Sequence, residues 1–439
     1  MSKISRRNFL VTASATTAAT LIINGCTSTQ TSSSSSSSPA SPSPVAAADT
    51  PEVTTAKLGF IALTDSAPLI IAKEKGLFAK YGMPDVEVVK QASWAVTRDN
   101  IELGSGGGGI DGAHILTPMP YLITAGKITK GNAKIPMNIL ARLNVNGQGI
   151  TLANSHADLK LGADSSPLKA VFAANKSSGQ DVKCAVTFPG GTHDLWMRYW
   201  LAAGGINPDK DVSTIVVPPP EMVANIKVNT MEAFCVGEPW NAQAVNQKVG
   251  YSALTTGEMW KDHPEKALAM RADWVEANPK AAKAITMAVQ EAQIWCDDLA
   301  NTEEMCKIVS GRQWFKVPAE DIVERMKGNF DFGNGRTLTG SDLRMRFWGN
   351  GASYPYQSHD LWFLTENIRW GYLPKDTDTA ALIKTVNRED IWQEAAKAIG
   401  QEAMIPKSTS RGVETFFDGI KFDPEKPEAY LKSLKIVKA

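Results

Sequence analysis

The chain has 439 residues, 43% of them hydrophobic, and its 46 Lys and Arg residues balance its 46 Asp and Glu residues. This length supports a large core and exceeds that of most single domains, so two lobes are expected. A nucleic-acid partner normally requires a basic excess, and the sequence has none. The five histidines and five cysteines are scattered without a CxxC pair, which argues against a zinc site.

The N-terminus has the pattern of an export signal. The twin-arginine motif SRRNFL at 5–10 precedes an apolar run at 11–23 that is too short to span a membrane. The run ends in Gly-Cys, which predicts a lipoprotein signal peptide over 1–25 and acylation of the Cys26 thiol with a fatty acid such as palmitate. An ordinary signal peptide with an incidental cysteine is the alternative.

Residues 26–53 follow as a Ser- and Pro-rich segment that includes seven consecutive serines, Ser32 to Ser38. Such a composition cannot form a core and predicts a disordered tether. The folded part is therefore expected to begin near Thr54. We expect it to be held by lipid on the periplasmic side of the inner (cell) membrane, which suits a protein that captures a solute for a membrane machine.

The folded part contains an internal repeat. The segments 56–115 and 182–240 each show the order strand, helix, strand, helix, strand. Two such units predict two α/β lobes with mostly parallel sheets and a ligand cleft between them, at the carboxyl ends of the strands. The expected elements are strands at 58–63, 86–89 and 110–114 with a helix at 68–75 in the first copy, and strands at 184–188, 212–217 and 231–235 with a helix at 195–203 in the second.

The stretch GSGGGGIDGAH at 104–114 raises the question of a phosphate-binding loop. No Lys-Ser or Lys-Thr pair follows it, and no dinucleotide fingerprint lies between a strand and the next helix. The glycines are therefore predicted to form the turn from a helix into a strand, where positive φ angles and close backbone approach are needed. A role in shaping the ligand pocket is the alternative.

The C-terminal half is predicted to be mostly helical. Asn278 and Pro279 begin a helix as N-cap and first-turn residue. The aromatic-rich tail from Gly340 is expected to pack on the first lobe. Cys184, Cys235, Cys296 and Cys306 are expected to be reduced core residues. The apolar stripe of the helix consists of Ala281, Ile285, Ala288, Val289, Ala292 and Trp295.

Several long motifs resemble those of the nitrate-binding lipoproteins of cyanobacterial nitrate ABC transporters. They include LGFIALTDSAPLIIAKEKGLFAKYGMPDVEVVKQASW, LNVNGQGI, FPGGTHDLWMRYWLAAGG, VGEPW, HPEKALAMRADWV and SYPYQSHDLWFLTENIRWGYLP, and the match runs from about Thr54 to the C-terminus. The resemblance implies a class II-type, two-lobed periplasmic binding protein with a helical C-terminal extension. It places lobe 1 at 54–145 and 245–439 and lobe 2 at 146–244.

The resemblance also implies a set of ligand contacts for nitrate. The bicarbonate-binding proteins of a sister transporter have Gln in place of the motif histidine and Glu in place of the motif lysine, and this chain follows the nitrate pattern at both positions. Nitrate carries no proton, so its pocket needs donors and positive charge and no acceptor. Without the resemblance, each of these residues would be read as an ordinary core, loop or surface residue. Carried over by motif, the contacts are Trp94, Gln148, His193, Gly237 and Lys266.

Two parts of the chain depart from the family pattern. Asn241 stands where the family usually has proline, and residues 161–183 are only loosely similar. Both departures lie outside the expected pocket.

The function implied is a solute-binding subunit, without enzymatic activity or cofactor, that delivers nitrate and also nitrite to an ABC permease with cytoplasmic ATPase subunits. Binding of bicarbonate or a sulfonate is the alternative within this class. An enzyme is a second alternative, because a pyrimidine synthase of thiamine biosynthesis shares the architecture. A sensor that docks on a receptor is a third.

Overall fold

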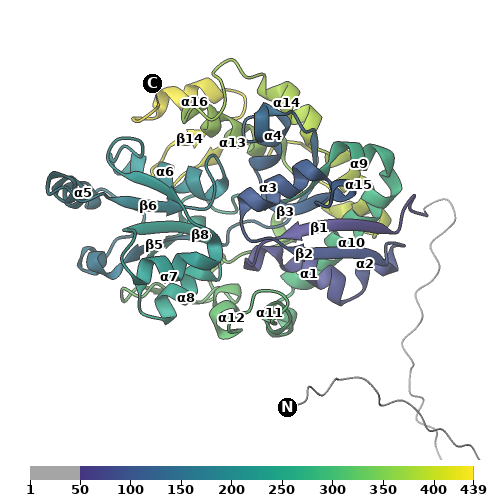
Figure 1. Ribbon diagram of the computed structural model, residues 1–439, viewed down its shortest axis with the longest axis horizontal. Coiled ribbons are helices and arrows are strands. Elements are labelled where there is room, and N and C mark those ends of the chain that lie inside the picture. The colour runs from purple at the N-terminus through teal and green to yellow at the C-terminus, as the bar shows by residue number, and fades with distance from the viewer. Residues whose placement is uncertain (1–49, 439) are drawn as a thin grey trace, which may run out of the picture. The chain divides into compact units, whose positions relative to one another are not determined.

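The structure is a computed structural model that describes residues 50–438. The predicted signal peptide at 1–25, Cys26 and most of the tether at 26–53 lie outside the described residues. The described body contains two five-stranded sheets, which lie beside each other with helices around each (Figure 1). The two α/β lobes predicted from the internal repeat are therefore confirmed.

The first sheet holds the N-terminal copy of the repeat and has the strand order β2-β1-β3-β10-β4. Strand β1 is parallel to β2 and β3, whereas β10 is antiparallel to β3 and β4. The mostly parallel arrangement was predicted; the antiparallel strand was not, because it lies outside the repeat. The strands are β1 (Thr55–Phe60), β2 (Asp85–Lys90), β3 (Gly112–Leu116), β4 (Met137–Arg142) and β10 (Lys266–Arg271).

The second sheet repeats this plan in the order β7-β6-β8-β5-β9. Strand β6 is parallel to β7 and β8, and β5 is antiparallel to β8 and β9. The sheet extends to Thr255, past residue 244, where the sequence placed the end of the second lobe. The strands are β5 (Gln148–Ala153), β6 (Lys183–Val186), β7 (Ser213–Val216), β8 (Ala233–Gly237) and β9 (Gly250–Thr255).

The chain crosses between the sheets after β4 and again after β9. Val145 and Pro264, one in each connection, form an antiparallel bridge, so the two connections lie side by side. Each connection leads into an antiparallel strand, β5 or β10. The first residues of β5 and β10 therefore lie at the same sheet edge as the last residues of the parallel strands. This is the edge at which open α/β sheets bind ligands.

The helices that follow the parallel strands begin at this edge. Helix α3 starts at Trp94, where the Ser93 hydroxyl accepts a hydrogen bond from the Val96 amide at 3.2 Å. Helix α6 starts at Thr192 after two glycines. The helices of the two lobes are α1 (Ala67–Glu74), α2 (Leu77–Lys80), α3 (Trp94–Leu103), α4 (Met119–Thr124), α5 (Leu168–Ser177), α6 (Thr192–Ala203), α7 (Met222–Lys227) and α8 (Trp240–Asn246).

The glycine-rich stretch forms the turn from α3 into β3. Gly104 and Gly108 have φ values of 65° and 86°, which disfavour other residues. At Gly109 an added Cβ would lie 2.0 Å from the Asn100 carbonyl oxygen. The structural role predicted for the glycines is thus confirmed.

Helix α10 (Pro279–Asp297) is the long helix predicted from its apolar stripe, and it packs against α1 and α15 (Glu389–Ala398). It begins at Pro279 with Asn278 in the N-cap position, as predicted, but the Asn278 side chain does not cap it. The Asn278 amide donates backward to the Trp274 carbonyl, whereas the Glu52 carboxylate accepts from the backbone of Lys280 and Ala281. The cap therefore comes from a residue far away in the sequence. The neighbouring helices are α9 (Ala272–Ala277), α11 (Thr302–Val309) and α12 (Glu320–Met326).

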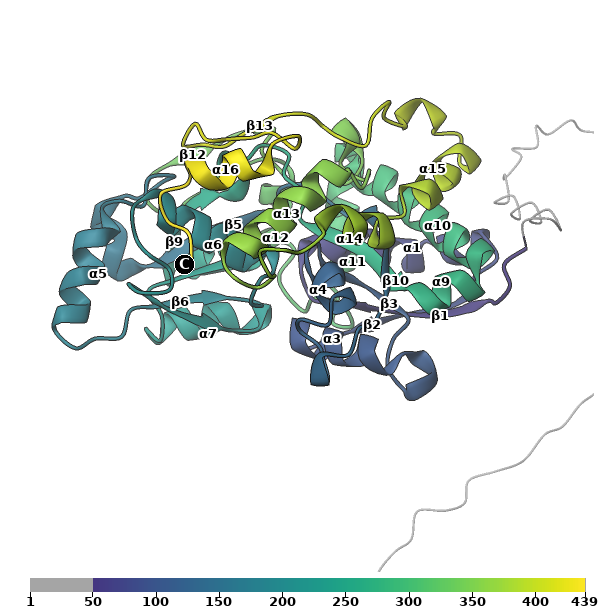
Figure 2. The same ribbon diagram turned by 90° about the horizontal axis from the view of Figure 1, so that it is seen from above.

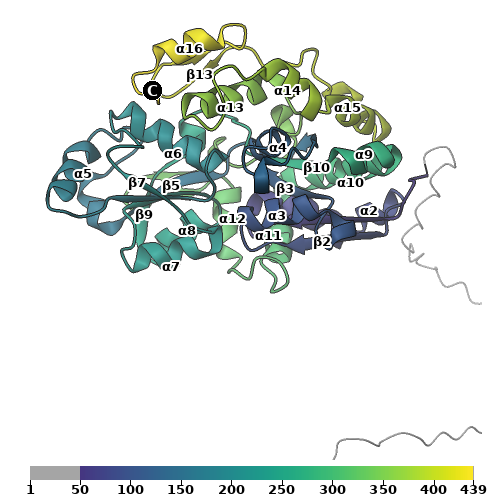
Figure 3. The ribbon, with the colours of Figure 1, turned by 45° about the horizontal axis from the view of Figure 1, so that its top comes forward.

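The C-terminal segment contacts both lobes. Tyr354 and Trp392 belong to the core cluster that contains the first sheet, whereas Trp362, Phe416 and Tyr430 belong to that of the second lobe. The expectation that the tail packs on the first lobe therefore describes only part of it. Figures 2 and 3 show its helices running along one side of both lobes. Its elements are α13 (Gln357–Arg369), α14 (Thr379–Val386), α15 (Glu389–Ala398), α16 (Pro427–Ser433) and the short strand pair Glu414–Thr415 with Lys421–Phe422. A second short pair, Phe330–Asp331 with Thr337–Leu338, precedes this segment.

The four cysteines of the described residues, Cys184, Cys235, Cys296 and Cys306, are free thiols buried in these cores. Burial raises their pKa values, to about 12 for Cys184 and Cys306, so they remain protonated. This agrees with their expected role as small core residues.

Candidate functional site

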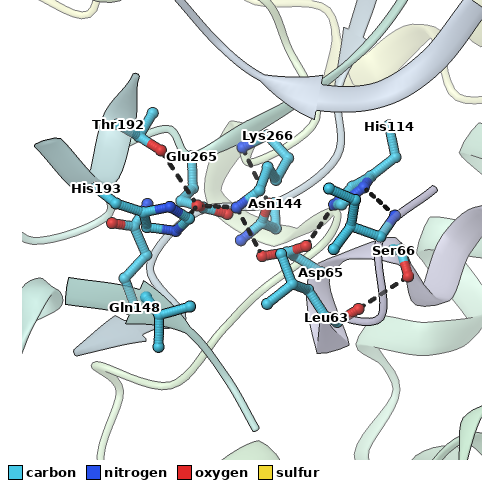
Figure 4. A network of polar contacts seen from close by, with 12 residues as sticks. Leu63, Asp65, Ser66, His114, Asn144, Gln148, Thr192, His193, Glu265 and Lys266 are labelled. Carbon is cyan, nitrogen blue, oxygen red and sulfur yellow. Dashed lines mark hydrogen bonds and ion pairs between the residues drawn. The ribbon is translucent and has the colours of Figure 1, made fainter. Parts of the chain in front are cut away.

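A network of buried polar side chains joins the two lobes at the ligand-binding edge of the sheets (Figure 4). Its centre is Lys266, the first residue of β10, whose side chain is fully buried. The Lys266 ammonium lies 2.9 Å from Asp65 Oδ2 and also contacts Glu265 Oε1. It lies 5.6 Å from the centre of the Trp94 ring, within the range of a cation–π interaction.

Asp65 is the fixed negative charge of this network. It follows β1, and both its oxygens are engaged: Oδ2 contacts Lys266 and Oδ1 contacts His114 Nε2. The Ile61 amide donates to His114 Nδ1 at 3.5 Å, so Nε2 carries the proton and donates to Asp65. Burial alone would raise the pKa of Asp65, but Lys266 and His114 outweigh it and hold that pKa below its usual range.

Glu265 behaves in the opposite way. Burial and the nearby Asp65 carboxylate raise the pKa of Glu265 well above its usual range, against the opposing effect of Lys266. Its Oε1 atom contacts Lys266 and lies 3.4 Å from the Thr192 hydroxyl. Its Oε2 atom is buried and makes no hydrogen bond. Glu265 is therefore a neutral carboxylic acid beside an ionised aspartate.

His193, at the start of α6, brings the second lobe into the network. Its Nδ1 atom contacts the Thr187 hydroxyl, and its Nε2 atom lies 3.2 Å from Glu265 Oε1 without hydrogen-bond geometry. Burial and the charge of Lys266 lower the pKa of His193 well below its usual value. The imidazole is thus neutral, with one nitrogen that has no hydrogen-bond partner.

Several buried polar atoms of these residues lack a partner in the described part of the chain. They are Trp94 Nε1, both amide atoms of Gln148, His193 Nε2 and Glu265 Oε2. An unpaired buried polar atom costs about 1–3 kcal/mol, so native proteins rarely collect several in one place. A small polar ligand among these atoms would pair several of them at once.

All five residues predicted as ligand contacts lie at this place. Trp94 and Lys266 come from the first lobe, and Gln148, His193 and Gly237 come from the second. Gln148 and Gly237 are register partners at the edge of the second sheet. A Cβ added to Gly237 would lie 3.0 Å from Asp65 Oδ2, so this glycine allows the lobes to meet. Contact of these five residues with a ligand stays a prediction.

Three residues of the network were not predicted from the sequence: Asp65, His114 and Glu265. Asp65 lies in the TDSAP motif, which was placed at a carboxyl strand end but given no role, and Glu265 directly precedes Lys266. A pocket for nitrate was expected to contain no acceptor, and the structure places two carboxyl groups on Lys266. The expectation and the structure agree only because of the protonation and contacts of these two groups: Asp65 has no free oxygen, and Glu265 holds a proton. Among residues 50–438, no group of His, Cys, Asp and Glu side chains is arranged to hold a metal ion.

Comparison with known proteins identifies the family of this chain and several of its relatives. The NMT1-like family profile matches residues 49–310, more than half of the chain. The chain belongs to the NMT1-like family. This NMT1-like chain is 65% identical to the nitrate/nitrite binding protein NrtA of Synechocystis over 442 residues, which cover 99% of the chain and 98% of that protein. It is 47% identical to the bicarbonate-binding protein CmpA of Synechococcus elongatus over 99% of both chains.

A solved structure agrees with the sequence comparison. The crystal structure of the periplasmic nitrate-binding protein NrtA from Synechocystis is 69% identical and superposes with a TM-score of 0.86, covering 88% of this NMT1-like chain and all of that one. The periplasmic binding protein fold implied by the sequence is therefore confirmed. The chain also matches part of the nitrate import ATP-binding protein NrtC of Synechocystis, at 34% identity over 55% of that protein.

Proposed function

We propose that this chain is the solute-binding subunit of an ABC importer that captures nitrate, and also nitrite, in the periplasm. The observation that carries the proposal is the buried ammonium of Lys266, with the unpaired indole and amide donors of Trp94 and Gln148 and the unpaired His193 Nε2 around it. A planar monoanion with three oxygen acceptors can accept from such donors while it lies near one positive charge. The 65% identity to a nitrate/nitrite binding protein supports the same ligand.

The chemistry of the two carboxyl groups favours nitrate over bicarbonate. Bicarbonate carries a proton and needs an acceptor, but both oxygens of Asp65 are engaged by Lys266 and His114. Glu265, as a neutral acid, offers a donor at Oε2. The higher identity to the nitrate/nitrite relative, 65% against 47% for the bicarbonate relative, points in the same direction.

Calorimetry on the purified protein tests the ligand. We expect nitrate and nitrite to bind with one site per chain, and bicarbonate, an alkanesulfonate and chloride to bind far more weakly or not at all. Tighter binding of bicarbonate or the sulfonate than of nitrate would reject the proposal in favour of that ligand. Incubation of the protein with each anion, followed by product analysis, separates binding from an enzymatic role.

A binding protein of this kind passes its ligand to a membrane partner. We propose a permease with cytoplasmic ATPase subunits, because the chain resembles part of a nitrate import ATP-binding protein. Among residues 50–438, no helix is long and apolar enough to cross a bilayer. The proposed attachment to the cell membrane therefore rests on Cys26, which lies outside these residues.

The Cys26→Ala variant should leave the membrane fraction and collect in the periplasmic extract, because the proposed acyl chains are attached to this thiol. Cell fractionation followed by immunoblotting measures the distribution. Nitrate affinity of the released protein should equal that of the wild type, since Cys26 precedes the folded body. A Cys26→Ala protein that stays in the membrane pellet after a high-salt wash would contradict the lipid anchor.

A further inference from the structure

Two carboxyl groups share one ammonium in this site. The Lys266 ammonium contacts Asp65 Oδ2 and Glu265 Oε1, and all three side chains are fully buried. Asp65 uses its second oxygen to accept from His114, whereas Glu265 Oε2 has no partner. Glu265 is therefore the carboxyl group with an oxygen left for a ligand.

The charges of the site determine the protonation state in which Glu265 Oε2 can contact an anion. If both carboxyl groups were ionised, a bound monoanion would be the third negative charge around one lysine. Buried charges without compensation are very unfavourable, and a group usually changes its protonation instead. A proton on Glu265 removes one negative charge and turns Oε2 from an acceptor into a donor.

We propose that Glu265 is a further anion contact, that it donates from Oε2–H to the bound nitrate, and that capture of the anion is coupled to uptake of one proton by Glu265. The proposal rests on nitrate being the ligand, as proposed above. It distinguishes Glu265 from Asp65, which stays ionised and positions Lys266. The proton comes from solvent as the lobes close over the site.

The other titratable groups in and around the network do not take up this proton, so Glu265 is the group that accepts it. The Lys266 ammonium already contacts Asp65, which is itself ionised. The neighbouring histidines are neutral, since burial lowers their pKa values, and the Cys235 thiol is protonated, since burial raises its pKa. The titratable groups of the network and its immediate surroundings are Asp65, His114, His193, Cys235, His263 and Lys266.

The direction of the pH effect follows from this coupling. In an open, hydrated cleft Glu265 should titrate near the usual glutamate value of about 4.3, whereas in the closed site its pKa is raised. Between these two values, nitrate binding takes up a proton, and affinity falls about tenfold for each unit of rising pH. Below the lower value Glu265 is already protonated and affinity no longer depends on it.

Calorimetry between about pH 5 and about pH 8, in buffers of different ionisation enthalpy, measures both affinity and proton uptake. We expect about one proton per nitrate for the wild type. Glu265→Gln keeps a donor but cannot titrate, so proton uptake and the pH slope should disappear. Glu303→Gln, a change at an exposed glutamate of α11, is the matched control and should keep both.

The outcomes separate this inference from the proposed ligand. Absence of nitrate binding at every pH would reject the proposed function itself. Nitrate binding without proton uptake, or with a slope that persists in Glu265→Gln, would overturn the role of Glu265. If Glu265→Gln does not fold, infrared difference spectra of the wild type decide: nitrate should produce the carbonyl band of a buried carboxylic acid, and its absence overturns the proposal.

Discussion

Replacement of Lys266 by methionine should lower the affinity for nitrate by about 100-fold or more. Charged hydrogen bonds contribute about 1.5–3 kcal/mol each, and about 1.4 kcal/mol corresponds to tenfold in Kd. The Lys266 ammonium is fully buried against Asp65 and Glu265. Without it, the anion would face the Asp65 carboxylate with no positive charge to offset the repulsion. Calorimetry with nitrate measures the loss.

Lys261→Met is the matched control for this variant. Lys261 lies a few residues earlier, pairs with Asp342, and has a side chain that is 55% exposed, so surface ion pairing there contributes little. Its nitrate affinity should equal that of the wild type. Thermal unfolding and circular dichroism show whether Lys266→Met is folded. A folded Lys266→Met protein with unchanged affinity would remove Lys266 from the site.

Much of the fold could be predicted because it repeats. The strand and helix pattern at 56–115 recurs at 182–240, and the two sheets follow the same plan. Strands β5 and β10 were not placed, since their partners are far away in the sequence. The C-terminal tail was placed on one lobe because its aromatic residues carry no sign of which core they join.

The site was predicted less completely than the fold. Residues such as Trp94 and Lys266 were selected by resemblance, because their spacing alone does not distinguish a ligand contact from a core tryptophan or a surface lysine. Asp65 and Glu265 were missed for a physical reason. A carboxyl group is an acceptor when ionised and a donor when protonated, and its state here depends on burial and on neighbours that only the fold brings together.

The site is shared by two lobes, which meet next to Gly237, so nitrate binding should change how close the lobes lie. The lobes meet here through hydrogen bonds from the Thr64 amide to the Glu238 carbonyl and from the Trp240 indole to the Ala62 carbonyl, at 2.8 and 3.0 Å. A ligand held by donors of both lobes should favour the closed arrangement, since only that state satisfies all the donors. Nitrate should therefore compact the wild-type protein in solution, and chloride at the same concentration should not.

Gly237→Val should prevent this closure and weaken nitrate binding by about 10- to 100-fold. An added Cβ lies 3.0 Å from Asp65 Oδ2 and 3.2 Å from Leu63 Cδ2, both in the first lobe, and overpacking of this kind costs about 1–3 kcal/mol. Within its own lobe a β-branched residue suits strand β8, so the second lobe should remain folded. Calorimetry measures the affinity, and small-angle scattering with and without nitrate measures the radius of gyration.

The control for this variant is Gly162→Val, since a Cβ at Gly162 would have its nearest neighbour, the Ala253 carbonyl oxygen, at 4.0 Å. It should bind nitrate and compact like the wild type. Gly237→Val should show neither change at nitrate concentrations that saturate the wild type. If Gly237→Val binds nitrate normally, the lobes do not need to meet at this glycine. If the wild type binds nitrate without a decrease in its radius of gyration, binding does not close the cleft. In the first case the site would function without the close approach of the lobes at Gly237, and the selection of nitrate would depend on Lys266 and its neighbours alone.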